Sequence, residues 1–146
     1  MPAECSLLRT LWLESELFRD HVKRMGLTFA QASRTALHVH HIFGGKTRKD
    51  LPSNTITICG AVHDFCHTHE WTGRIACLKW KLDAGQLDWT EIDQSAGYSV
   101  EGRLWGLQDH MPEPFKKMAH VLARDAERAR HATAHSTDTS PPMPHT

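Results

Sequence analysis

The stretch TALHVHHIFGGKTRKDLPSNTITICGAVHDFCHTHEW, residues 35–71, decides how this chain is expected to fold. Residues 35–43 and 55–59 are rich in β-branched and aromatic side chains, which is typical of short strands. Residues 44–54 between them are dense in Gly, Pro, Asn and Asp, and this composition predicts a loop. From residue 61 to Gly73 no helix breaker occurs, so the predicted order is strand, loop, strand and helix.

Helices are predicted on both sides of this centre. Residues 6–25 carry apolar side chains at helical spacing, and helices are also predicted for 74–84 and 115–131, with two short helices between them. Residues 132–146 are small, polar and rich in proline, which predicts a disordered tail. The predicted organisation is an N-terminal helical segment (1–34), a core (35–73), a C-terminal helical extension (74–131) and the tail (132–146).

Histidine stands out in the composition. The chain of 146 residues contains 12 histidines, and six of them, at 38, 40, 41, 63, 67 and 69, lie close together in the sequence. Imidazole is the commonest metal ligand in proteins and titrates near neutral pH, so we expect chemistry in this segment. Five tryptophans and a hydrophobic content of 40% favour a packed core over disorder. The four cysteines form no C-x-x-C pair, which excludes a four-cysteine zinc ribbon.

Charge is segregated along the chain although the formal net charge is zero. Residues 34–49 sum to +4, residues 83–113 to −6 and residues 114–131 to +3. The neutral total excludes a highly basic nucleic-acid coat protein and a polybasic membrane anchor. The basic run coincides with the histidine-rich segment, whereas a charge run alone is most often a solvated surface.

The sequence also predicts a cytoplasmic location. No apolar run approaches the 18–20 residues that a membrane-spanning helix needs. The N-terminus carries Glu4, Glu14 and Glu16 and lacks the basic and then apolar layout of a signal peptide. A reducing compartment makes a disulfide framework an unexpected use for the cysteines.

The spacing of four histidines suggests a metal site. His40 and His41 are adjacent at the end of a strand, so their side chains are expected to point to opposite faces. His63 and His67 are four residues apart on the predicted helix and share one face. A third nitrogen from His40 would leave open positions on the ion for water or phosphate oxygens, as in catalytic rather than structural sites.

The combination of H-H-I at 40–42, N-T-I-T-I-C at 54–59 and H-x-x-x-H at 63–67 resembles the HNH endonucleases with a ββα-metal (His-Me finger) core, which include colicin-type DNases and phage HNH nucleases. The resemblance covers residues 36–72. It implies an α+β fold in which the small ββα-metal core is flanked by several α-helices, so that the chain is mostly helical overall.

The resemblance also implies residue roles. His41 corresponds to the general base that takes a proton from the attacking water, and Asn54 to the asparagine that braces the inter-strand loop and orients that base. His40, His63 and His67 correspond to ligands of one divalent ion, which would be Mg²⁺, Mn²⁺, Ni²⁺ or Zn²⁺. The residues expected to hold flanking phosphates of DNA are Lys46, Arg48, Lys49 and Arg74.

The function implied is a metal-dependent DNA endonuclease. Many relatives carry C-x-x-C pairs for a structural zinc, but here Val62 stands where the partner of Cys59 would be, so no structural zinc is expected. The alternative is a non-catalytic structural zinc or DNA-binding module in which Cys59 and Cys66 join His63 and His67. A phage protein partner is also possible, because small relatives often belong to phage or prophage packaging or recombination systems.

Overall fold

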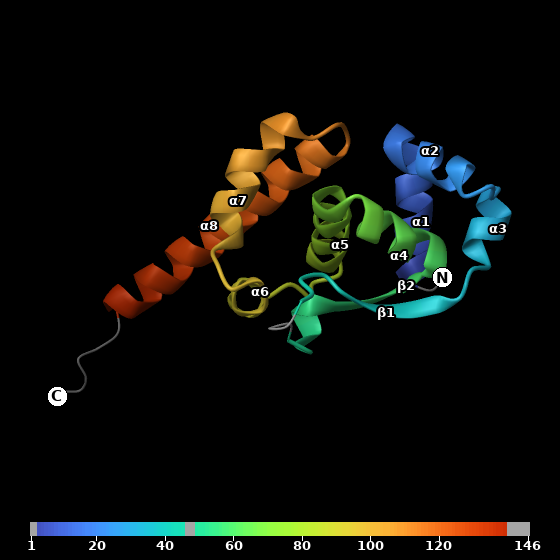
Figure 1. The fold of residues 1–146 in the computed structure, drawn as a ribbon. Coiled ribbons are helices and arrows are strands. Elements are labelled where there is room, and N and C mark those ends of the chain that lie inside the picture. The colour runs from blue at the N-terminus through green and yellow to red at the C-terminus, as the bar shows by residue number, and fades with distance from the viewer. Residues whose placement is uncertain (1–2, 46–48, 140–146) are drawn as a thin grey trace.

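The computed structural model describes the backbone of residues 3–45 and 49–139 and the side chains of 6–45 and 49–132. Figure 1 shows a mostly helical molecule with one small sheet, which confirms the α+β class. The helices are α1 (Ala3–Glu14), α2 (Glu16–Arg24), α3 (Phe29–Ser33), α4 (Gly60–Thr68), α5 (Glu70–Asp83), α6 (Trp89–Ala96), α7 (Val100–Leu107) and α8 (Phe115–Thr139). The strands are β1 (Leu37–His41) and β2 (Thr55–Cys59), and short 3-10 turns span Pro52–Asn54 and Gln108–His110.

The two strands form an antiparallel pair with His40 opposite Ile56 and His41 opposite Thr55. Successive side chains of a strand point to opposite faces, and Val39 and His40 follow that rule, whereas His38 is exposed although it shares a face with His40. Val39 is 67% exposed, whereas His40 is 8% exposed and Ile58 is completely buried. The buried face packs on α1 and α4. The second strand ends at Cys59 and leads directly into α4, the helix that carries His63 and His67.

The prediction of one N-terminal helix over 6–25 is wrong in one respect, because the structure has two helices that divide at Ser15. The Ser15 side chain accepts a hydrogen bond from the backbone N–H of Phe18 at 2.9 Å, so it caps α2 and ends α1. The short helix α3 was not anticipated. Thr28 and Gln31 begin it with a reciprocal capping box, in which each side chain bonds the other residue's backbone N–H.

The predicted break between the two central helices at Gly73 is also wrong. The chain turns at His69, where φ is −120° and ψ is 79°, and Gly73 lies inside α5. A Cβ atom at Gly73 would lie 2.6 Å from Cys66 Cα and 2.9 Å from Cys66 Sγ. The glycine therefore permits close packing of α5 on α4 instead of ending a helix.

The core is continuous from the N-terminal helices to α8. The ring of Phe65 on α4 contacts the ring of Phe18 on α2 at 5.1 Å and that of Phe115 on α8 at 6.1 Å between centroids. All three rings are completely buried. Because α4 is held on both sides by these contacts, its histidine-bearing face is fixed relative to the sheet.

The last helix is longer than the sequence predicted. The predicted boundary was residue 131 with a disordered tail over 132–146, but α8 continues to Thr139. Residues 132–139 contain no proline, and the first proline of this region is Pro141, so no proline interrupts the helix before its end. Residues 140–146 lie outside the described residues. Figure 1 shows the C-terminal part of α8 extending beyond the other helices.

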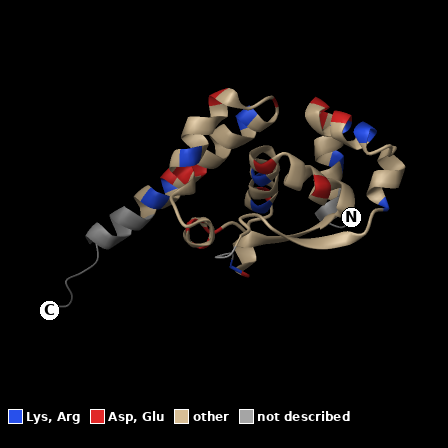
Figure 2. Ribbon diagram, viewed as in Figure 1, with Lys and Arg blue, Asp and Glu red and all other residues tan. Residues whose placement is uncertain are grey.

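The acidic and basic segments of the C-terminal region meet where α7 packs on α8. Arg130 Nε donates to Glu101 Oε1 at 2.9 Å, and Figure 2 shows residues of both signs on these neighbouring helices. The bond from Arg130 lowers the pKa of the Glu101 carboxyl. Part of the charge segregation is therefore neutralised within the fold.

In the described part of the chain, no helix has both the length and the apolar character to cross a bilayer.

Candidate metal centre

Three histidines from two elements converge beside the sheet. Ligand nitrogens of His40, His63 and His67 all lie within 4.8 Å of one another. The Nε2 atoms of His63 and His67 are 3.1 Å apart. Two imidazoles bound to one ion at about 2.0–2.1 Å would span that distance at an angle of about 95–102°. The separation therefore suits one shared ion without rearrangement of α4.

Local structure explains the convergence. His40 occupies the buried face of β1, and α4 packs against that strand. His63 and His67 lie one turn apart on α4, and their rings meet the ring of His40 edge to face at 5.2 Å and 5.7 Å between centroids. The structure thus brings together the three residues that the sequence nominated as ligands.

The surroundings keep His63 neutral. Burial, followed by the neighbouring imidazoles of His40, His67 and His38, lowers the pKa of His63 to about 4. The ring of His38 stacks on that of His63 at 4.6 Å with an interplanar angle of 6°. A neutral imidazole has a free lone pair, so this site is ready to bind a cation at neutral pH.

The histidine environment predicts acid sensitivity in the metal-free protein. His63 titrates near 6.5 when unfolded and about 4 when folded, so the unfolded state binds more protons between these values. The contribution of His63 to stability is therefore fully present above pH 6.5 and is lost as the pH falls from 6.5 toward about 4. Burial, His21 and Arg24 lower the pKa of His69 in the same direction.

The measurement is the free energy of unfolding by urea between pH 7 and pH 5. The difference in unfolding free energy between pH 7 and pH 5 should be smaller in His63→Gln than in wild type. In the control His110→Gln, on an exposed turn, this difference should equal that of wild type. An equal loss of stability in wild type and His63→Gln would contradict the prediction.

His41 is separate from the three-histidine cluster and is held by a carboxylate. Its Nε2 lies 2.6 Å from Asp50 Oδ1, and the side chains of His41 and Asp50 are 17% and 87% exposed. A carboxylate bonded to one ring nitrogen fixes the tautomer and the orientation of an imidazole. Asp50 is not among the residues predicted from the sequence, where its only signal is its position in the loop between the strands.

Asn54 fixes that loop from inside. It is completely buried, its Oδ1 accepts from the Phe43 N–H at 2.8 Å, and its Nδ2 donates to the carbonyls of Phe43 at 3.1 Å and Lys49 at 2.9 Å. Lys49 immediately precedes Asp50. The amide therefore ties both ends of the inter-strand loop and indirectly positions the carboxylate that holds His41.

A cavity of about 340 Å³ is lined both by His41 and by two members of the three-histidine cluster, His40 and His67. Its lining also includes Arg74. Arg74 Nε donates to the Ile42 carbonyl at 3.0 Å, which fixes the guanidinium in the lining. Of the other predicted phosphate-binding residues, Lys49 is exposed on the loop, and Lys46 and Arg48 lie outside the described residues.

Two buried thiols lie close to His40, one member of the three-histidine cluster. His40, Cys66 and Cys77 form a second group whose ligand atoms lie within 4.8 Å of one another. The two sulfur atoms are 3.8 Å apart, which is about the separation expected for thiolates on a tetrahedral zinc ion with Zn–S bonds of about 2.3 Å. Hydrogen bonding to Cys77 lowers the pKa of Cys66. Among described residues, Cys59 is not part of this group, and Cys77 was not anticipated.

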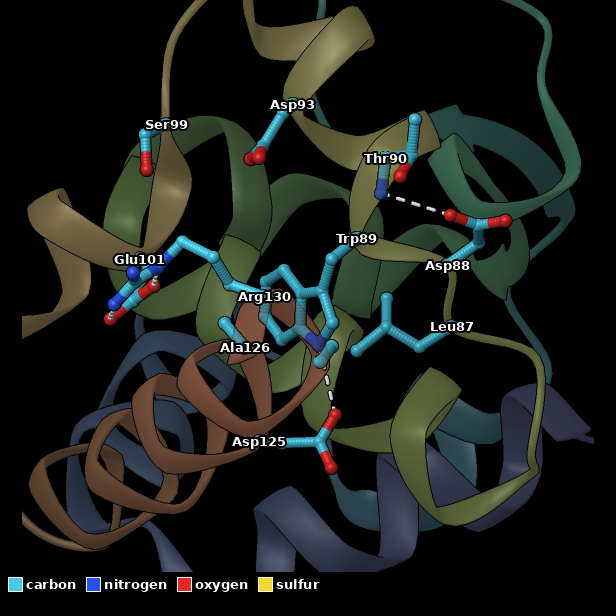
Figure 3. Close-up of a pocket in the computed structure, with 11 residues that line it drawn as sticks. Leu87, Asp88, Trp89, Thr90, Asp93, Ser99, Glu101, Asp125, Ala126 and Arg130 are labelled. Carbon is cyan, nitrogen blue, oxygen red and sulfur yellow. Dashed lines mark hydrogen bonds and ion pairs between the residues drawn. The ribbon is translucent and has the colours of Figure 1, made fainter. Parts of the chain in front are cut away.

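A larger pocket lies among α6, α7 and α8. Figure 3 shows its lining, which encloses about 750 Å³ and contains several carboxylates. Asp125 accepts from the Trp89 indole at 2.8 Å and Glu101 pairs with Arg130. Among the described residues, the carboxylates of this pocket do not converge as a metal-ligating group, and these two bonds hold the helices together.

A scan against protein-family models found no match to this chain, and searches of the curated proteins and of the solved structures also returned none. The geometry of the site and the resemblance of its motif are therefore what bears on function.

Proposed function

We propose that this protein is a metal-dependent DNA endonuclease that hydrolyses phosphodiester bonds. The observation that carries the proposal is the convergence of His40, His63 and His67 within 4.8 Å, because it forms an open three-nitrogen site. His41 lies next to His40 in the same cavity and is oriented by Asp50. In this proposal β1, β2 and α4 form a ββα-metal core.

The chemistry follows from these positions. With Nε2 of His41 bonded to Asp50, Nδ1 is left to accept a proton from water, whose oxygen attacks phosphorus as the bond to the leaving oxygen breaks. A divalent ion, when bound, would neutralise charge on the phosphate and the leaving oxygen. Arg74 in the cavity lining and the basic inter-strand loop would hold the adjacent phosphates.

The test is cleavage of supercoiled plasmid DNA by protein stripped with a chelator. We expect nicked or linear DNA only after Mg²⁺, Mn²⁺, Ni²⁺ or Zn²⁺ is restored, because the histidines alone do not stabilise the developing charge. His67→Ala should require far more metal for the same rate. Cleavage that proceeds equally well in the presence of the chelator would contradict the proposal.

A second candidate is a structural zinc module without catalysis, acting by itself or in a phage packaging or recombination complex. The observation that favours it is the buried set of His40, Cys66 and Cys77. This function predicts zinc that resists mild chelation, unfolding after its removal, and DNA that remains intact with every ion. The endonuclease predicts exchangeable metal and a fold that survives its loss.

A further inference from the structure

An aromatic and cationic strip adjoins the candidate metal centre. The guanidinium of Arg74 lies over the rings of Phe43 and Trp71, at 4.7 Å and 5.0 Å from their centroids. The guanidinium of Arg103 lies 5.9 Å from the Trp71 ring and 4.9 Å from the Tyr98 ring. These side chains come from α5, α7, the loop after β1 and the turn between α6 and α7, so the strip is formed by tertiary folding.

Core packing does not account for the outer part of this strip. Tyr98 is 37% exposed, Arg103 is exposed and Trp71 is partly exposed, whereas Phe43 beneath them is buried. A guanidinium stacked on a ring presents a flat, positively charged surface to solvent. Such a surface matches the flat base and the adjacent phosphate of a nucleotide.

The strip is continuous with the cavity of the metal centre. Arg74 lines that cavity and also stacks on Trp71, so one residue belongs to both. Glu70 pairs with Arg74 at 3.4 Å, and Arg103 adds a second positive charge farther along. A nucleic-acid strand with one phosphate in the cavity would therefore have its neighbouring nucleotide beside the aromatic surface.

We infer that Trp71, Tyr98 and Arg103 bind an unstacked nucleobase, and that the DNA bound here is single-stranded or locally opened. The bases of an intact duplex are stacked on one another and have no free face for these side chains, whereas a single strand does. The inference rests on the proposed function, because it specifies the form of DNA that the same site receives.

The test is fluorescence anisotropy with the full chain and no divalent ion added. The probes are a labelled thymidine oligonucleotide, an abasic oligonucleotide of the same length and charge, and the corresponding duplex. Tyr98→Ala should weaken thymidine binding by about 5- to 150-fold, the range for loss of one base–aromatic stack, with little change for the abasic probe. Arg103→Gln should weaken binding of both probes, and of the thymidine probe more, because it removes a positive charge as well as a stacking plane. Tyr98→Phe should bind like wild type.

Arg128→Gln is the matched charge control, because this exposed arginine on α8 pairs with Asp125. Equal affinity of wild type for the thymidine and abasic probes would overturn the inference, as would tighter binding of the duplex than of the single strand. This readout is separate from cleavage. Base-dependent binding without metal-dependent cleavage would contradict the proposed endonuclease and support the binding strip. Metal-dependent cleavage without base-dependent binding would support the endonuclease and contradict the binding strip.

Discussion

Replacing His41 with alanine is expected to slow metal-dependent cleavage of plasmid DNA by about 10²–10⁴-fold, the usual contribution of a general base. The side chain of His41 is 17% exposed, and the three-histidine cluster does not include it. Melting temperature and metal affinity should therefore stay close to those of wild type. Imidazole added to the assay should restore part of the rate, because a free base can occupy the vacated position.

Two companion variants make this prediction specific. Asp50→Asn should reduce cleavage by about 10–100-fold, the usual cost of losing a group that orients an imidazole. Lys79→Gln is a control, because Lys79 pairs with Asp83 on α5. A folded His41→Ala protein that cuts DNA at the wild-type rate would show that another group is the base.

Replacing Asn54 with alanine is expected to lower the free energy of unfolding by about 2–4 kcal/mol and to reduce cleavage per folded molecule. The substitution removes three side-chain hydrogen bonds and leaves the N–H of Phe43 without the acceptor it has in a buried site. The carbonyl of Lys49 is released as well, and Asp50 then loses its fixed position beside His41.

Ser53→Ala is the matched control for this second prediction. Ser53 is also buried, and its hydroxyl donates to the Gln86 carbonyl and accepts from the Asp88 N–H, so its loss should also destabilise the protein. These bonds lead toward α6 and not toward His41. Cleavage normalised to the folded fraction should fall in Asn54→Ala and not in Ser53→Ala. Equal rates in both variants would mean that Asn54 has no role in positioning the base.

The strands and the helix at the centre of the fold could be predicted from sequence because each is determined by the residues of its own segment. Alternating β-branched residues, a loop rich in turn formers and an uninterrupted run after residue 60 determine strands and a helix independently of distant contacts. The i, i+4 spacing of His63 and His67 likewise fixes their shared face. The position of His40 beside them follows from the antiparallel pairing of β1 with β2 and the direct connection of β2 to α4.

The remaining features depend on tertiary contacts or on competing local signals. Ser15 has the polar side chain of many helical surface residues, and only its hydrogen bond to Phe18 identifies it as a cap. Gly73 resembles a helix terminator until Cys66 is placed against it. Cys77 is distant from the histidines in sequence and reaches His40 only because α5 packs closely on α4.

The most direct measurement is the rate of plasmid cleavage as the preferred ion is titrated into metal-free protein, compared for wild type, His67→Ala and Cys77→Ala. We predict that wild type and Cys77→Ala reach similar rates per folded molecule, and that His67→Ala remains nearly inactive at ion concentrations that saturate wild type. Loss of cleavage in Cys77→Ala with full activity in His67→Ala would place the catalytic ion at the thiols and contradict the assignment of His40, His63 and His67.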